Sequence, residues 1–104
     1  MSRRMSPLLF IAMLSVTANA LADAESAKAT ATSLCAGCHG PQGISAVDAY
    51  PNLAGQKKAY LASALKAYRE KTRTNGMMNA MASSLKDQDI DDLAAYFSGL
   101  TPGH

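Results

Sequence analysis

The sequence predicts an all-α protein, and three observations lead to that class. Residues 56–71 and 87–98 place apolar side chains at helical intervals and charged side chains on the remaining faces. Residues 23–34 are rich in alanine, which has the highest helix propensity. No useful length of the sequence alternates apolar and polar residues as a half-buried strand would. We therefore expect helices joined by loops, without an internal repeat.

Residues 1–22 have the features of a secretory signal peptide. Arg3 and Arg4 give a basic start, an almost wholly apolar run follows, and a small-x-small cleavage sequence ends at Ala22. The apolar run is short for a helix that spans a membrane. We expect this segment to be removed on export to the periplasm, which leaves residues 23–104 as one domain without an integral membrane segment.

Export also changes the charge balance of the chain. The full sequence has 10 Lys and Arg residues and 8 Asp and Glu residues, and its net charge is +2. Without Arg3 and Arg4 the two counts are equal, so the exported chain is close to neutral. A general nucleic-acid-binding role therefore loses its main support. A chain of this size builds only a small hydrophobic core, and a bound cofactor would supply a centre for it.

Residues 23–34 are predicted to form a short helix that leads to Cys35. Acidic Asp23 and Glu25 stand at its start, where negative charge complements the helix dipole. Several glycines and a proline follow the second cysteine and interrupt regular structure. We therefore expect a loop to open at His39.

The stretch 56–71 is predicted to be an amphipathic helix. Its apolar side chains Leu61, Leu65 and Tyr68 recur at the spacing of one helical face. A turn sequence ends it, and the methionine-rich segment 77–81 that follows shows no clear period. We expect irregular structure in that segment.

The stretch 87–98 restores the helical period. Ile90, Leu93 and Phe97 form its apolar face, and aspartates crowd its first turns, where negative charge is favourable. Gly99 follows its last residue, as is common after a helix. This is the third helix that the pattern predicts.

The pentapeptide Cys35-Ala36-Gly37-Cys38-His39 contains the only two cysteines of the chain. Two thiols at this spacing reach the two vinyl groups of one haem while the adjacent imidazole reaches the iron. A thiol oxidoreductase pair lacks its usual βαβ context here. A zinc site would need the distant His104 as a further ligand. The adjacent histidine, which neither alternative requires, favours one covalently attached haem c with its iron.

The residues leave the second axial ligand of the iron open among three methionines. The only other histidine is His104, so a second imidazole is nearly excluded. Met77, Met78 and Met81 lie together between two predicted helices. A thioether ligand raises the reduction potential of a haem relative to a second imidazole. A methionine that does not bind iron usually fills gaps in the core. We expect one of the three to bind iron and the other two to pack.

Further motifs accompany the pentapeptide in order along the chain. They are CAGCHG at 35–40, PNLAGQ at 51–56, RTN at 73–75, MNAM at 78–81, LKDQDI at 85–90 and LAAYF at 93–97. With these motifs the chain resembles class I c-type cytochromes, most closely the small bacterial monohaem members and one half of the dihaem cytochromes c-four. The resemblance covers nearly all of residues 34–99. It implies an all-α class I cytochrome c fold, with three to four short helices around one covalently attached haem.

The resemblance also implies which residues hold the haem. Cys35 and Cys38 would form the covalent bonds, and His39 and Met78 would be the axial ligands of the iron. In the family the axial methionine precedes the leucine before the last helix by the spacing that Met78 has here. Met81 would pack near the ring and is the alternative ligand.

The resemblance implies a role for Pro51 as well, because it matches the proline of the family's P-x-L-x-G motif. Its carbonyl would accept a hydrogen bond from His39 Nδ1, which fixes the imidazole and increases its basicity. The sequence departs from the family at Lys86, where serine or threonine is usual. Asp87 or Ser84 is then expected to cap the last helix.

These features predict a soluble periplasmic electron-transfer protein that passes single electrons through a haem with His and Met ligands. Redox proteins, a donor and an acceptor, are its expected partners, and no catalytic group is visible that would make it an enzyme. The alternatives are a haem-based gas-binding or sensing module, a haem subunit of a larger oxidoreductase complex, and a thiol-disulfide protein. The sequence leaves open whether Arg73 and Asn75 bind a haem propionate or only form the turn before the methionines.

Overall fold

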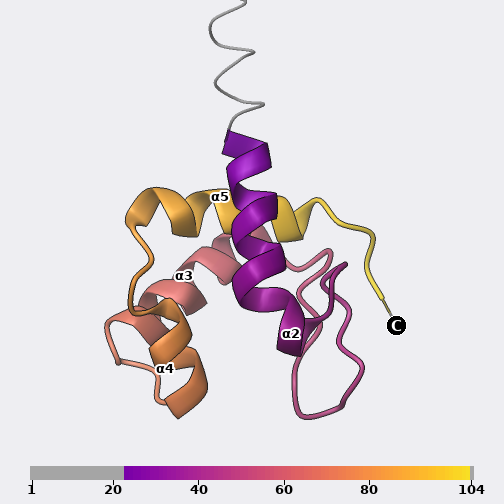
Figure 1. Cartoon of the computed structure of the whole chain (residues 1–104). Helices are drawn as coiled ribbons and strands as arrows, with labels where there is room; N and C mark the ends of the chain where they lie inside the picture. Colours follow the sequence, from indigo (N-terminus) through magenta and orange to yellow (C-terminus); the bar gives the residue numbers. More distant parts are fainter. Residues whose placement is uncertain (1–22, 104) are drawn as a thin grey trace, which may run out of the picture.

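The computed structural model describes residues 23–103, and every regular element in that range is a helix (Figure 1). The all-α class is therefore confirmed for the described residues. The predicted signal peptide at 1–22 and the terminal His104 lie outside them. Between residues 23 and 103, none of the helices combines the length and the apolar character that a membrane span requires.

The described chain begins with a helical segment that runs further than expected. Residues 23–30 are α-helical, the helix widens to π geometry in η1 (Ala31–Cys35), and α2 (Ala36–His39) completes it. The helix was expected to lead only to the first cysteine, whereas it includes both cysteines and the histidine. The break comes at Gly40, because Gly40 has a φ of 87°, which leaves the helical region.

The second predicted helix is α3 (Lys58–Arg69), which lies inside its predicted range. Leu61 is buried, and Leu65 and Tyr68 are half-buried against the same core. The apolar stripe that predicted the helix is therefore the face that packs. Soon after the helix, Lys71 takes a φ of 63°, and the chain turns toward the methionine-rich segment.

The methionine-rich segment is the helix α4 (Gly76–Ala82), so the prediction of irregular structure there was wrong. Asn75 caps this helix, and its side-chain oxygen accepts a hydrogen bond from the backbone N–H of Met78 at 3.0 Å. Ala82 is fully buried in the core. The 7 residues of α4 make about two turns, which are too few for an apolar period to repeat.

The last helix, α5 (Asp87–Ser98), has the predicted bounds at both ends. Its N-cap is Lys86, whereas Asp87 or Ser84 was expected in that role. Lysine has no side-chain acceptor. Instead, the carboxylate of Asp89 accepts a hydrogen bond from the backbone N–H of Lys86 at 2.9 Å. The cap is thus supplied from inside the helix, as one half of a capping box.

The core is centred on α5. Its buried side chains pack with residues of η1 and α3 and with residues at the end of α4. The cluster consists of Ala31, Leu61, Ala82, Leu85, Ile90, Leu93, Ala94 and Phe97. In Figure 1, α5 runs across the upper part of the molecule, and α4 and α2 lie below it on two sides, with α3 packed against both α5 and α4. This arrangement leaves a cavity below the core.

Candidate functional site

A cavity of about 410 Å³ separates the segment that carries the two cysteines from the methionine helix. Its walls come from η1, α2, the loop at 49–56, α3 and α4, and Leu93 and Phe97 of α5 close it on the side of the core. Most of the lining side chains are aliphatic, aromatic or sulfur-containing. The space therefore favours a flat apolar group with a few ligands rather than a polar substrate.

Among the described residues, His39 is the buried polar or charged residue, and it lies at the end of α2 on the cavity wall. Its Nδ1 lies 2.8 Å from the carbonyl oxygen of Pro51. A carbonyl oxygen can only accept, so Nδ1 carries the proton in this bond. In the neutral imidazole, Nε2 then keeps its electron pair, which is the form that binds a metal.

Two glycines bring Pro51 back to the histidine. Gly40 has a φ of 87° and Gly43 a φ of 74°, so the chain reverses directly after α2. The carbonyl of Gly43 accepts hydrogen bonds from the backbone N–H groups of Leu53 at 2.7 Å and Ala54 at 3.0 Å. The segment that follows Pro51 is thereby fixed against the start of the loop.

Cys35 and Cys38 both line the cavity and are both half-buried. They are separated by about one helical turn, which places them on one side of the helix. Neither forms a disulfide. Burial raises the pKa of the Cys35 thiol to about 11. A thiol that stays protonated near neutral pH is a poor nucleophile, which weighs against Cys35 as the attacking thiol of a thiol-disulfide protein.

The three methionines of α4 all reach the cavity but differ in exposure. Met77 is 47% exposed and Met81 38% exposed, whereas Met78 is half-buried. The Sδ of Met77 lies 3.8 Å from the Sγ of Cys38. Figure 1 places α4 and α2 on two sides of the molecule, so the methionines and His39 approach the cavity from different elements.

Asn79 fixes the methionine helix, and sequence reasoning gave it no role. Its Nδ2 donates to the carbonyls of Tyr68 at 2.8 Å and Arg73 at 2.9 Å. Its Oδ1 accepts from the backbone N–H of Asn75 at 2.9 Å. One side chain therefore joins α4, the end of α3 and the turn between them. The pair of asparagines around the methionines was the available signal, because such residues favour caps and turns.

The donor set fits a haem better than its competitors. Two thiols one turn apart, an imidazole with Nε2 available and several thioethers surround an apolar cavity. Within residues 23–103, no group of three or more His, Cys, Asp and Glu side chains is placed to bind a metal ion, so a structural zinc site finds no support there. Soft sulfur and imidazole donors are also those that haem iron takes.

Comparison with known proteins agrees with this chemistry. The family model for cytochrome c matches residues 24–101. Cytochrome c-554(548) of Halomonas halodenitrificans is 48% identical over 67 residues, which are 62% of this chain and 81% of that protein. Cytochrome c4 of Thiocapsa roseopersicina is 42% identical over 83 residues, which are 78% of this chain and 43% of that protein.

Comparison with a solved structure shows that the fold is similar as well. The cytochrome c4 structure from Acidithiobacillus ferrooxidans superposes with a TM-score of 0.71 at 32% identity and covers 76% of this chain and 50% of that one. The chain thus spans about half the length of the cytochrome c4 proteins that it matches. It belongs to the cytochrome c family of electron-transfer proteins, and its cofactor is a covalently bound haem c with its iron.

Proposed function

We propose that the protein is a soluble periplasmic electron carrier rather than an enzyme. Its haem would be attached through Cys35 and Cys38 and ligated by His39 and Met78. The observation that carries the proposal is the cavity in which these four residues meet, from α2 with η1 on one side and α4 on the other. When bound, haem supplies an iron that alternates between the ferric and ferrous states.

His39 would bind the iron through Nε2. The hydrogen bond from Nδ1 to the carbonyl of Pro51, 2.8 Å long, supports this because it fixes the tautomer and the orientation of the ring. The carbonyl also draws on the Nδ1 proton and makes Nε2 more basic toward iron. The same bond would resist rotation of the imidazole ring and so keep His39 oriented toward the haem.

Met78 is the methionine that we assign as the second axial ligand. Three features support it over Met77 and Met81: its lower exposure, its motif position, and the bond of its backbone N–H to Asn75 at 3.0 Å. A thioether ligand favours ferrous iron relative to a second imidazole. The aliphatic and aromatic side chains of the cavity wall would limit the access of water to a bound haem.

The location and the partners are further parts of this proposal. The basic start, apolar run and cleavage sequence of residues 1–22 support export to the periplasm. Redox proteins would deliver and accept the electrons. For the Acidithiobacillus ferrooxidans cytochrome c4, electron transfer is described as tuned within a complex. Co-purification from the periplasm would separate a free carrier from a subunit of an oxidoreductase complex.

Redox titration and carbon monoxide binding of the exported holoprotein test the proposal. We expect one covalent haem by mass, reversible one-electron reduction, and no carbon monoxide binding to the ferrous protein at neutral pH, because Met78 fills the site. Ready binding of carbon monoxide to the wild-type protein would instead favour a gas-binding or sensing module. A chain that matures without haem would contradict both.

A further inference from the structure

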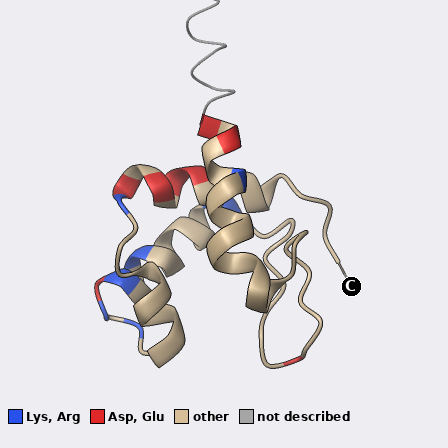
Figure 2. Cartoon of the chain, in the orientation of Figure 1, with Lys and Arg blue, Asp and Glu red and all other residues tan. Residues whose placement is uncertain are grey.

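The loop that carries Pro51 to His39 has a hydrogen-bond network of its own. The loop spans residues 40–56, and Asp48 is its only charged residue. In Figure 2 this loop is almost wholly tan, whereas acidic residues gather on α5 and basic residues at the turn between α3 and α4. The polar contacts within the loop therefore join uncharged groups.

Ser45 bonds to the residues on both sides of Pro51. Its hydroxyl donates to the carbonyl oxygen of Tyr50 at 2.5 Å, and the carbonyl oxygen of Val47, 2.9 Å away, shares that proton. Its backbone N–H donates to Oδ1 of Asn52 at 2.8 Å. One half-buried serine thus holds the residue before the proline and the residue after it.

These bonds leave the carbonyl group of Pro51 little freedom to turn. The proline ring fixes φ, and the planar peptide group before it is bonded to Ser45 through the carbonyl of Tyr50. Only a rotation about ψ of Pro51 could then redirect its carbonyl. That rotation would move Asn52, whose side chain is bonded to Ser45 as well. The carbonyl is therefore held in the direction from which it accepts the bond from His39.

Ser45 itself lies outside the cavity. Among the described residues, the cavity wall includes Tyr50, Pro51 and Asn52, whereas Ser45 is not part of it. A group in the cavity would therefore feel the Ser45 hydroxyl only through other residues. The path runs through the carbonyl of Pro51, which lies 2.8 Å from His39 Nδ1.

We propose that Ser45 is a positioning residue for His39 and that it lowers the reduction potential of the haem. The inference rests on the proposed function, since it needs a haem bound through His39. A well-aligned bond from Nδ1 to the carbonyl of Pro51 makes Nε2 more basic toward iron. A more basic ligand favours the ferric ion, which carries one more positive charge than the ferrous ion. Loss of the Ser45 hydroxyl weakens this alignment, so the potential rises.

Midpoint potentials of the S45A, S45T and N52A holoproteins test the assignment, with S98A as the matched control. Ser98 is also half-buried, and its hydroxyl bonds within α5, to the carbonyl of Ala95 at 3.1 Å. We expect S45A to shift the ferrous-to-ferric ratio about threefold toward ferrous, a rise of about 30 mV. N52A should shift the potential in the same direction, because it removes the other bond to Ser45. S45T keeps the hydroxyl, so it and S98A should stay close to the wild type.

The NMR chemical shift of the His39 Nδ1 proton in the ferrous holoprotein separates positioning from a general loss of stability. This proton reports the strength of the bond to the Pro51 carbonyl directly. We expect it to move upfield in S45A and in N52A, because the bond is weaker. In S98A and S45T it should keep the wild-type value.

Three results would overturn the inference. The first is an S45A holoprotein with the potential and the Nδ1 proton shift of the wild type. The second is an equal change in S45A and S98A. The third is a change in S45T as large as in S45A, because the hydroxyl would then not be its cause. If S45A yields no holoprotein, an unchanged Nδ1 proton shift in N52A overturns the inference instead.

The proposed function is checked separately on the same samples. The wild-type holoprotein should show the mass of one covalent haem and the absorption spectrum of His and Met ligation. Loss of these features in the wild type counts against the proposed function. An unchanged potential and Nδ1 proton shift in an S45A protein that keeps both features counts against the Ser45 assignment alone.

Discussion

Asn79 holds the methionine helix α4 to the end of α3 and to the turn between them. Its amide bonds three backbone groups, in α3, in the turn and at the start of α4, at 2.8 to 2.9 Å. A helix of 7 residues has little stability of its own. The position of Met78 relative to the cavity therefore depends on this side chain and on the cap from Asn75.

We expect N79A to loosen the methionine helix. Each lost hydrogen bond costs about 1 kcal/mol, so the free energy of unfolding of the holoprotein should fall by about 1–3 kcal/mol. The band of methionine-bound haem should also disappear at a lower denaturant concentration than in the wild type. S83A is the control, because the Ser83 hydroxyl bonds only within α4, to Ala80. Equal effects of N79A and S83A would contradict a positioning role for Asn79.

Gly43 has no side chain, yet it helps to position His39 through the loop that carries Pro51. It has a φ of 74°, and a Cβ there would come within 2.9 Å of the backbone nitrogen of Ala54. Only glycine adopts this conformation and permits this approach without strain. Gly43 thereby keeps the loop closed over Pro51, and Pro51 in turn orients His39.

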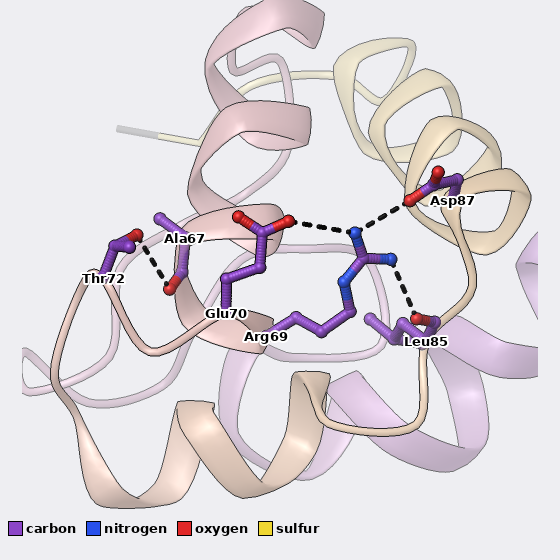
Figure 3. A network of polar contacts seen from close by, with 6 residues as sticks. All are labelled: Ala67, Arg69, Glu70, Thr72, Leu85 and Asp87. Carbon is purple, nitrogen blue, oxygen red and sulfur yellow. Dashed lines mark hydrogen bonds and ion pairs between the residues drawn. The ribbon is translucent and has the colours of Figure 1, made fainter.

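Arg69 connects two helices at the scale of elements. From the last residue of α3 it donates to the carboxylate of Asp87, the first residue of α5, at 2.8 Å and to the carbonyl of Leu85 at 3.1 Å (Figure 3). The hydrogen bond from Arg69 and its positive charge lower the pKa of Asp87. The link holds the start of α5 against the end of α3.

The lowered pKa of Asp87 predicts a dependence of stability on pH. A carboxylate whose folded pKa lies below its unfolded value stabilises the fold above the unfolded pKa, and this contribution disappears as the pH falls through the folded pKa. We expect D87N to be less stable than the wild type near neutral pH and to match it in strong acid. Denaturant unfolding of both holoproteins from neutral to strongly acidic pH measures this. D91N serves as control, since Asp91 forms no ion pair within residues 23–103.

The helices differed in how well the sequence predicted them, for physical reasons. In α5 the apolar period repeats over 12 residues, and its bounds were predicted correctly. In α4 the period cannot repeat, and the cap comes from Asn75, which was taken as part of a turn. The first helix was predicted to lead only to Cys35, whereas it continues through His39 and ends where Gly40 takes a positive φ.

The same contrast holds within the candidate site. Cys35, Cys38 and His39 could be recognised from their spacing, because covalent attachment imposes a local pattern on the chain. Asn79 could not be assigned, because its partners lie in a different element and only the folded chain brings them together. Arg73 was left open for the same reason, since its contact with Tyr60 spans 13 positions of the sequence.

The cavity is the main feature at the scale of the whole molecule, with a volume of about 410 Å³ in a chain of this size. Leu61, Leu93 and Phe97 belong both to the core cluster and to the cavity wall. A haem held in the cavity would therefore contact members of the core cluster.

At the scale of the whole molecule, one haem would join two halves of the protein, through His39 on one side and Met78 on the other. Replacing each methionine of α4 in turn, as M77A, M78A and M81A, tests it most directly. The visible spectrum and the midpoint potential of each holoprotein are measured. We expect M78A alone to lose the band of methionine-bound ferric haem and to fall in potential, because its thioether favours ferrous iron. Retention of that band in M78A, with its loss in M77A or M81A, would contradict the assignment.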